Sequence, residues 1–419
     1  MMNRESKEEN ERMTDRLYYD DAYLWKFEAT VVSTREEKDC CWIELDRSAF
    51  YPTSGGQPYD TGTLSWTDEK GKEKAAEVSD VTVDGNGIVW HRTAGSIPAG
   101  TKVAGTIDGE RRTDHMEQHG GEHMLAGAVW EKLGGTTIGL HLGADTSTID
   151  VSMPEGRTHL TGEEIRMLEE TVNARIRLDA PIRCWFPDQE ELERLPLRKP
   201  PTVREHVRVV AMGDFEMVAC GGTHPGSTGR IGQLKILSAV PSKGKVRLTF
   251  VCGRRAEKLF RDYMVYIHKA GNVLSCPPER VAGAAGQLIA RLAEAERKLN
   301  RFETERILQL IRAQEDTESL PGATISVTLM EKTEERPAME AVSGYISGKG
   351  KILLLSAGER LIFARSGDID LDMNTLIKRV ARGGGRPELA SGAGIPQCAE
   401  VAKKILMTEG KGKKWRKEI

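Results

Sequence analysis

The hydrophobic pattern near the start of the chain is that of short strands. Between residues 25 and 112, runs of β-branched and aromatic residues alternate with turn residues, as at 27–32, 41–45 and 88–91. Such runs predict β-strands, so we expect a small β-barrel or sandwich here. The preceding residues 1–24 are polar and mixed in charge. They predict a frayed or partly helical extension.

The pattern changes to a mixture of helices and strands between residues 113 and 253. Residues 115–133 have apolar positions at helical spacing, and Thr161 followed by two glutamates predicts the start of a second helix, to about residue 176. The remaining apolar runs predict strands at 138–143, 147–151, 182–186, 207–210, 231–236 and 246–251. We therefore expect an α+β domain.

A long helix is predicted next, from Pro277 to about residue 314, within a helical connector at 254–318. Its apolar positions alternate at spacings of four and three, which is typical of a coiled-coil seam; they are Leu288, Leu292, Ala295, Leu299 and Phe302. Self-association and an intramolecular helical hairpin would both bury this seam. Residues 319–419 then predict a compact α/β domain, with strands at 325–330, 351–356 and 361–364, a helix at 373–380 and a final helix from about 395.

Composition excludes some classes of protein. The 419 residues have a formal net charge of −3, so any contact with nucleic acid must come from local basic patches. The seven cysteines are odd in number and lack disulfide-framework spacing. With no signal peptide and no apolar run of membrane length, we expect a cytoplasmic protein.

Two short motifs carry candidate metal ligands. His119 and His123 are four residues apart, so a helix places them on one face. Cys220 and His224 have the same spacing around a Gly-Gly-Thr turn. Three imidazoles and one thiolate form a donor set suited to zinc, and two matched pairs favour a metal site over unrelated core residues.

A glycine-rich motif lies inside the predicted β-domain, at residues 50–58. It contains Thr53, Gly55, Gly56 and Gln57. The two glycines would let backbone NH groups approach the polar atoms of a ligand. A plain loop between two strands is the alternative.

The C-terminal domain holds a second glycine run, at 383–385, followed by Arg386. Its NH groups beside Arg386 would suit a phosphate, or the run is a tight connection. From residue 401 onward there are six lysines and one arginine against two glutamates. This tail predicts an RNA surface with Trp415 available for stacking; its basic residues include Lys413, Lys414 and Arg416.

Together the motifs resemble those of a known family. FYPTSGGQ (50–57), QHGGEHML (118–125), LHLGADTSTID (140–150) and MGDFEMVACGGTHPGSTGRIG (212–232) are similar to the free-standing alanyl-tRNA editing proteins of the AlaX group, long form, and to the editing domain of alanyl-tRNA synthetase. The resemblance covers roughly residues 25–253. It implies that His119, His123, Cys220 and His224 bind zinc, and that the protein hydrolyses the ester joining a wrong amino acid, chiefly serine and also glycine, to alanine-accepting tRNA.

The resemblance implies roles that the residues can be tested against. Glu122 is the candidate general base, with a solvent-facing or supporting carboxylate as the alternative. Thr53, Gln57 and Thr223 are candidates to bind a serine hydroxyl. Zinc either activates water or only shapes the pocket, because four protein ligands are typical of structural sites. A non-catalytic RNA-binding protein and a deacylase for another small aminoacyl-tRNA are the competing hypotheses.

The C-terminal run GGGRPELA (383–390) is similar to the domain associated with DHH phosphoesterases and alanyl-tRNA synthetase. That resemblance implies tRNA contact and a homodimer through the C-terminal region. No DHH motif is present in the sequence, so phosphoesterase activity is not implied.

Overall fold

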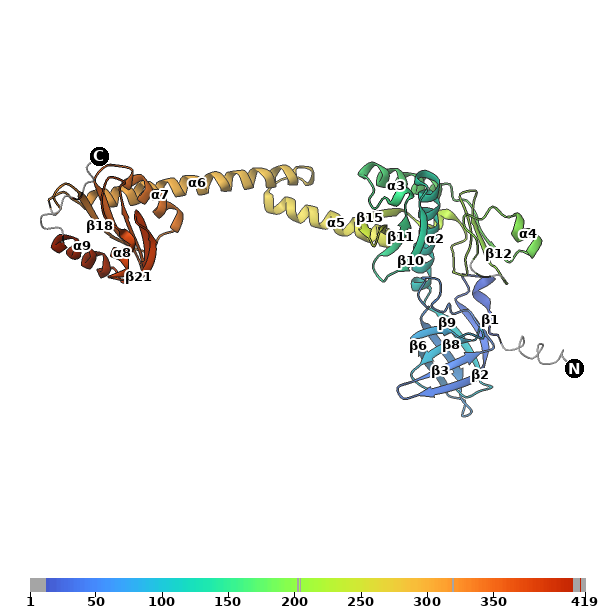
Figure 1. The fold of residues 1–419 in the computed structure, drawn as a ribbon. Helices are drawn as coiled ribbons and strands as arrows, with labels where there is room; N and C mark the ends of the chain where they lie inside the picture. Colours follow the sequence, from blue (N-terminus) through green and yellow to red (C-terminus); the bar gives the residue numbers. More distant parts are fainter. Residues whose placement is uncertain (1–12, 202, 204, 319, 410–414, 416–419) are drawn as a thin grey trace. The chain divides into compact units, whose positions relative to one another are not determined.

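A computed structural model describes residues 13–201, 203, 205–318, 320–409 and 415. The chain divides into two compact units between Tyr266 and Ile267 (Figure 1). The division falls inside helix α5 (Gly253–Leu274). Within the described residues, no helix combines the length and the apolar character needed to span a membrane.

The first unit begins with a seven-stranded sheet in the order β6-β5-β9-β2-β3-β8-β7. Its strands are Lys26–Glu37 (β2), Cys40–Leu45 (β3), Gly62–Thr67 (β5), Glu73–Val78 (β6), Asp80–Val83 (β7), Val89–Thr93 (β8) and Lys102–Ile107 (β9). The alternating burial along β2 and β9 places one face of the sheet on a core of aliphatic and phenylalanine side chains.

This sheet corrects the prediction of a small β-barrel. Its edge strands β6 and β7 do not pair with each other in the described part of the chain, so the sheet is open. Three of the six positions of β6 are both exposed and charged: Glu73, Lys74 and Glu77. Charged side chains along an edge strand oppose further pairing, which explains why the sheet does not close.

The residues before this sheet are packed rather than frayed. Asp15–Arg16 (β1) pairs with Arg47–Ser48 (β4), and the 3-10 turn Leu17–Tyr19 (η1) follows. The Tyr18 side chain is buried. The prediction of fraying is therefore wrong for residues 13–22, whereas the alternative of a partly helical segment agrees with the turn at 17–19. Residues 1–12 lie outside the described residues.

The rest of the first unit is built around one long helix, α2 (Gly109–Leu133). It packs against α3 (Gly162–Arg177) and a four-stranded sheet. That sheet has the order β10-β11-β16-β15, from Thr136–Leu142, Ser147–Ser152, Lys245–Cys252 and Leu234–Ser242. A three-stranded sheet, β12-β13-β14, contains Ile182–Trp185, Val209–Met212 and Glu216–Ala219; the short segments η2 (Pro154–Gly156), α4 (Gln189–Arg194) and η3 (Thr228–Ile231) complete the unit.

The second unit contains a six-stranded sheet in the order β17-β18-β19-β20-β22-β21. The strands are Glu315–Asp316 (β17), Thr324–Met330 (β18), Lys351–Ala357 (β19), Arg360–Arg365 (β20), Arg382–Arg386 (β21) and Leu389–Ala393 (β22). Alternate residues of β19 enter two different cores, so the sheet is covered on both faces. The end of α6 (Val281–Ala313) and α7 (Glu335–Ile346) cover one face; α8 (Met373–Lys378) and α9 (Gln397–Glu409) cover the other.

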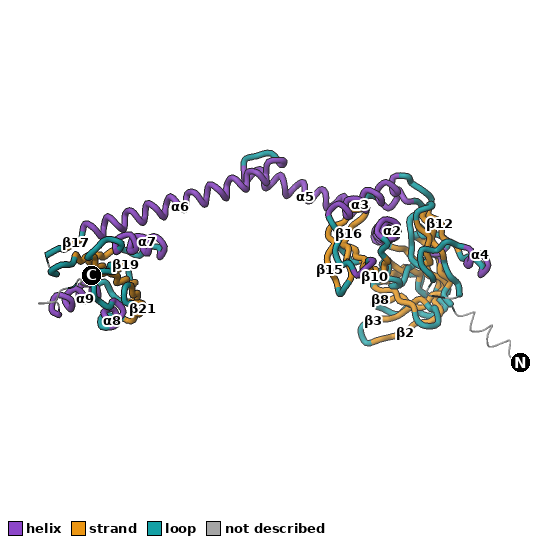
Figure 2. The backbone as a smooth tube through the Cα atoms, turned by 45° about the horizontal axis from the view of Figure 1, so that its top comes forward, coloured by secondary structure: helices purple, strands orange, loops and turns teal. Residues whose placement is uncertain are grey.

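The long predicted helix is α6, which runs without a break after the short turn η4 (Pro278–Arg280) (Figure 2). The predicted seam occupies the middle of this helix, and all five of its residues are exposed: Leu288, Leu292, Ala295, Leu299 and Phe302. Ile307 and Ile311, farther along, are buried against α7. Helix α5 lies within the predicted helical connector at 254–318. No helix was predicted at α4 or α7, and the predicted helix at 373–380 extends two residues beyond α8.

Candidate metal centre

Helix α2 carries the first pair of candidate ligands. Asp108 begins the helix by accepting hydrogen bonds from the Glu110 and Arg111 NH groups, both at 3.1 Å. The helix is buried from His115 to Val129, including His119 and His123. Gly121 permits this burial, because a Cβ atom there would lie 2.0 Å from the Cys252 sulfur. Close packing thus explains why a glycine stands at this position of the helix.

The second pair follows strand β14. The NH group of Cys220 donates to the Arg208 carbonyl at 2.9 Å. The Arg208 guanidinium donates in turn to the carbonyls of Cys220, at 3.1 Å, and Gly222, at 2.8 Å. One buried arginine therefore fixes the backbone of the Gly-Gly-Thr turn, and with it the side chains of Cys220 and His224.

The four predicted ligands meet in one place. The Cys220 Sγ atom lies 3.5 Å from His119 Nε2 and 3.4 Å from His224 Nε2. One ligand atom from each of the four residues lies within 4.8 Å of the others. Zinc bound tetrahedrally at ordinary nitrogen and sulfur distances separates such ligand atoms by roughly 3.5 Å. The buried imidazole of His123 also has no hydrogen-bond partner at either nitrogen. The residues therefore fit a zinc ion.

Burial sets the protonation of these groups. It lowers the pKa of His119 to about 3, and it holds the pKa values of His123 and His224 well below the ordinary histidine value. The imidazoles are therefore neutral, the form that binds metal. Burial raises the pKa of the Cys220 thiol to about 12. A cation at the centre favours the thiolate and opposes this effect.

The glycine-rich motif supports the centre from the neighbouring sheet. Gly55 and Gly56 have φ values of 57° and 88°, so residues 54–57 form a tight turn that needs glycine at both central positions. The turn delivers Gln57, whose Oε1 accepts hydrogen bonds from His119 Nδ1 at 2.8 Å and from the Thr223 NH at 3.1 Å. His119 therefore keeps its proton on Nδ1 and presents Nε2 to the metal position.

Two of the residues predicted to touch the substrate are fully buried, whereas a third, Thr53, is exposed. Gln57 and Thr223 have no exposed surface, and Gln57 Nε2 donates to Thr223 Oγ1 at 2.8 Å. In this arrangement neither side chain is available to a substrate hydroxyl. Thr53 is exposed, but its hydroxyl accepts a hydrogen bond from the Tyr59 NH. Gly56 lies against β10, and its carbonyl accepts from the Leu142 NH at 3.1 Å.

A cavity of about 340 Å³ opens beside the four ligands. His119, His123 and Cys220 line it, together with Ser54 and Gly55 from the turn. Glu122 also lines it and is 5 % exposed, so this carboxylate lies at the centre rather than in solvent. Burial raises its pKa to about 7, and the nearby Arg198 opposes that shift.

Three further residues line this cavity and were missed by the sequence analysis. Thr137, on β10, has a buried hydroxyl without a hydrogen-bond partner. Arg198 and Lys199 come from the loop between α4 and β13. No spacing in the sequence connects these positions to the ligands, because separate elements bring them together only in the fold.

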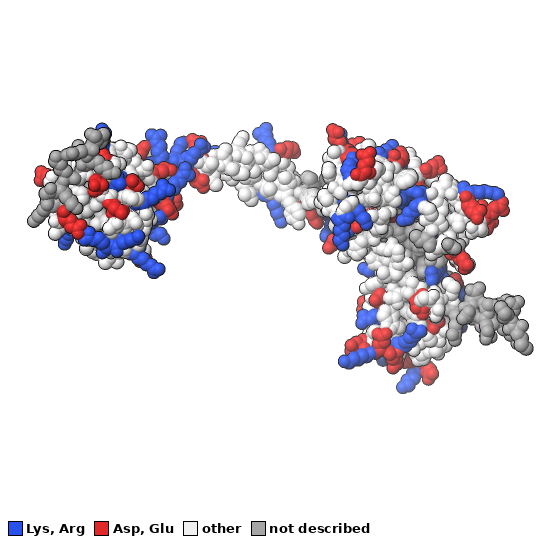
Figure 3. All heavy atoms as spheres, viewed as in Figure 1, with Lys and Arg blue, Asp and Glu red and all other residues white. Residues whose placement is uncertain are grey.

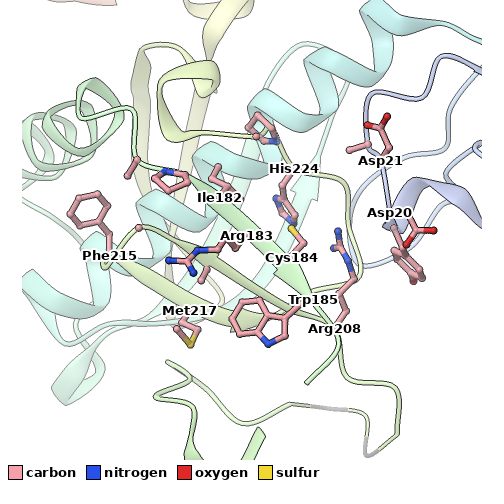
Figure 4. Close-up of a pocket in the computed structure, with 18 of the residues that line it drawn as sticks. Asp20, Asp21, Ile182, Arg183, Cys184, Trp185, Arg208, Phe215, Met217 and His224 are labelled. Carbon is pink, nitrogen blue, oxygen red and sulfur yellow. The ribbon is translucent and has the colours of Figure 1, made fainter. Parts of the chain in front are cut away.

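A larger cleft of about 1060 Å³ includes His224 among its lining residues (Figure 4). Asp20 and Asp21 lie at one end of it and Phe215 and Met217 at the other. Glu191 and Asp214 also line it, so four carboxylates surround the space. It contains none of the other metal ligands. The smaller cavity is therefore the better candidate for chemistry at the centre.

The predicted RNA-binding residues lie in the second unit. The glycine run belongs to strand β21, which pairs with β22 in a hairpin at the edge of the sheet and is therefore not a loop. Arg386 is exposed at the end of β21. Lys413, Lys414 and Arg416 lie outside the described residues. Trp415 is 5 % exposed and packs in the core, which contradicts the prediction that it is available for stacking.

Comparison with known proteins agrees with the site. The family described as "Threonyl and Alanyl tRNA synthetase second additional domain" matches residues 207–249, and "tRNA synthetases class II (A)" matches residues 2–111. The chain is 31% identical over 409 residues to the alanyl-tRNA editing protein AlaX-L of Pyrococcus horikoshii, which covers 91% of this chain and 94% of that protein.

Longer relatives match as well. The alanine–tRNA ligase of Pyrococcus abyssi is 31% identical over 399 residues, covering 90% of this chain and 42% of the ligase. That of Archaeoglobus fulgidus is 32% identical over 410 residues, covering 91% and 42%. This chain therefore spans about two fifths of the length of these ligases, but nearly the whole of the editing protein. The chain belongs to the family of alanyl-tRNA editing proteins of the AlaX-L type.

Proposed function

We propose that the chain is a zinc-dependent hydrolase that acts in trans on alanine tRNA mischarged with serine or glycine. The observation that carries this proposal is the convergence of His119, His123, Cys220 and His224 beside a cavity that also holds Glu122. The similarity to the alanyl-tRNA editing protein of Pyrococcus horikoshii supports the same substrate class.

The chemistry explains why such an enzyme is needed. A pocket for alanine cannot strongly reject glycine, which is smaller, or serine, which adds only a hydroxyl. Discrimination of this kind is limited to about 1–3 kcal/mol, so accuracy requires a second, hydrolytic site. A bound zinc ion supplies Lewis-acid polarisation or activation of water at such a site.

The residues of the cavity have the chemistry for the remaining roles. Glu122, with a pKa raised to about 7 by burial, suits a general base that takes a proton from water. Gly55, in the turn beside the ligands, brings backbone groups to the cavity without a side chain. The unpartnered hydroxyl of Thr137 provides a partner for the hydroxyl of a seryl group.

Release of amino acid from a panel of charged tRNAs tests the proposal. We expect hydrolysis of Ser-tRNA(Ala) and Gly-tRNA(Ala), with Ala-tRNA(Ala) and correctly charged Ser-tRNA(Ser) left intact. Hydrolysis of a different small aminoacyl-tRNA alone would support the broader deacylase hypothesis instead. RNA binding with no hydrolysis of any member would support a non-catalytic protein.

Replacement of Thr137 tests the choice of amino acid. Thr137→Val keeps the shape of the side chain and removes the hydroxyl. We expect kcat/KM for Ser-tRNA(Ala) to fall about tenfold, with little change for Gly-tRNA(Ala), because glycine has no hydroxyl to bind. An equal fall for both substrates would indicate a structural role for Thr137 and contradict this assignment.

The second unit is proposed to hold the tRNA. Arg382 and Arg386 occupy exposed positions on the edge strand β21, where phosphates can approach. Charges of both signs are mixed over the visible surface, so local patches rather than net charge would bind RNA (Figure 3). Unchanged affinity of an Arg382→Ala, Arg386→Ala variant for intact tRNA(Ala) would contradict this role.

We propose that the chain forms a homodimer in which a second copy packs against the apolar seam of α6. Leu288, Leu292 and Leu299 are each more than half exposed at coiled-coil spacing. The surface over the first turns of α6 carries little charge (Figure 3). We expect sedimentation at the mass of two copies, and at the mass of one copy for Leu292→Glu. A monomeric wild type across micromolar concentrations would exclude this dimer.

A further inference from the structure

Arg198 is held rigidly at the wall of the metal cavity. Its NH group donates to the Met217 carbonyl at 2.9 Å. Its side-chain Nε donates to both carboxylate oxygens of Glu216, at 2.8 and 2.9 Å. The two side chains are only 8 % and 1 % exposed. A buried ion pair of this kind fixes the guanidinium in one position.

Glu216 is fixed in turn against the helix that carries two metal ligands. A Cβ atom at Gly127 would lie 2.6 Å from a Glu216 carboxylate oxygen, so only glycine leaves room for this contact. Gly127 is four residues after His123 and therefore lies on the same face of α2. The position of Arg198 is thus set relative to the metal ligands themselves.

Arg198 keeps a donor that the protein does not use. The buried Nη1 atom of its guanidinium has no hydrogen-bond partner, although most buried donors in proteins have one. The loop that carries it places Lys199, an exposed cation, next to it at the same cavity. A fixed arginine beside an exposed lysine is a favourable arrangement for binding a phosphate.

Charge decides on which side of Arg198 an anion would bind. Arg198 also lines a second cavity of about 490 Å³, but Glu131 and Asp214 line that space and would repel an anion. The metal cavity has Lys199 in their place, and Glu122 is its one lining carboxylate among the described residues.

We propose that Arg198 and Lys199 form the subsite for the phosphate on the 5′ side of the esterified terminal nucleotide. This inference rests on the proposed function, since it assigns a part of the same substrate to a part of the same cavity. Arg198 would act as a positioning residue, bringing the ester to the metal centre through a contact with the nucleotide backbone.

Direct binding of AMP and adenosine by the full-length, metal-loaded chain tests the subsite without relying on hydrolysis. We expect AMP to bind about tenfold more tightly than adenosine, because adenosine lacks the phosphate. Arg198→Gln and Lys199→Gln should each reduce this preference severalfold. Arg194→Gln is the matched control, because Arg194 is an exposed cation on α4 and should leave the preference unchanged.

Folding of the variants is controlled separately. Arg198→Gln leaves Glu216 buried without its partner, so the double variant Arg198→Gln, Glu216→Gln replaces the ion pair by two amides. Lys199→Gln changes only an exposed side chain. Loss of the AMP preference in both the double variant and Lys199→Gln would support the subsite. Equal binding of AMP and adenosine by wild type, or an AMP preference retained in both variants, would overturn it.

Kinetics distinguish the phosphate from the ester itself. For Ser-tRNA(Ala), Arg198→Gln should raise KM about tenfold with kcat nearly unchanged. For 3′-seryl-adenosine, which has no phosphate, the same variant should behave like wild type. An equal fall of kcat on both substrates would place Arg198 at the ester carbonyl and refute the phosphate subsite. Absence of hydrolysis by wild type would contradict the proposed function, whereas the AMP preference would still report on the subsite.

Discussion

Replacement of His123 by alanine is expected to reduce hydrolysis of Ser-tRNA(Ala) at least about a thousandfold and to lower the zinc content of the purified chain. Loss of a residue that only supports a metal ligand lowers metal affinity or activity by about 10–100-fold. A larger effect is expected here because His123 is predicted to be a ligand itself. Neither nitrogen of its buried imidazole has a hydrogen-bond partner among the described residues. Zinc analysis and single-turnover deacylation measure the two effects.

A graded series sharpens this result. Gln57→Leu removes the hydrogen bond to His119 Nδ1 while leaving all four ligands, so zinc affinity should fall about 10–100-fold. His141→Ala is the control, because His141 is an exposed histidine on β10 that does not line the cavity. Its zinc content and activity should match those of wild type.

Melting of the same proteins separates a catalytic from a structural metal. Chelation should lower the melting temperature of wild type, since the ligand set is buried around Gly121, and added zinc should restore both melting and activity. If wild type and His123→Ala are equally inert while both bind RNA, the hydrolase proposal is wrong. Unchanged melting and turnover after verified removal of zinc would show that the metal is needed neither for stability nor for hydrolysis.

The sequence predicted which residues form the candidate metal centre because their geometry is mostly local. His119 and His123 share a helix face, and Cys220 and His224 share one turn, so only the meeting of the two pairs required the fold. Thr137 and Arg198 could not be found in this way. Each lies far from the ligand motifs along the chain, and neither belongs to a pattern with a chemical spacing.

The same distinction explains the errors in the fold. Single strands follow from local alternation, but closure of a barrel depends on whether edge strands such as β6 and β7 pair, which their own pattern does not determine. Gln57 was assigned to a substrate because its motif is glycine-rich, whereas its partners Thr223 and His119 are distant in sequence. Trp415 is surrounded by lysines in the sequence but packs in a core supplied by other segments.

Replacement of Arg112 by methionine is expected to destabilise the first unit by about 3–5 kcal/mol, because it leaves the buried carboxylate of Asp60 without a counter-charge. Arg112 and Asp60 are fully buried, and Arg112 Nε donates to the two Asp60 oxygens at 3.0 and 2.9 Å. Arg112 also donates to the carbonyls of Ala22, at 2.9 Å, and Ala49, at 2.6 Å. One side chain thus joins the N-terminal segment, the seven-stranded sheet and helix α2.

Urea unfolding followed by tryptophan fluorescence measures this effect, since six of the seven tryptophans precede residue 266. The matched control is Arg247→Met, which breaks a bidentate pair with Asp150 whose two side chains are solvent-accessible, and it should change the free energy of unfolding little. The double variant Arg112→Met, Asp60→Leu should recover much of the loss, because it removes the unpaired buried charge. Equal stabilities of the single and double Arg112 variants would show that the carbonyl contacts, rather than the charge of Asp60, account for the effect.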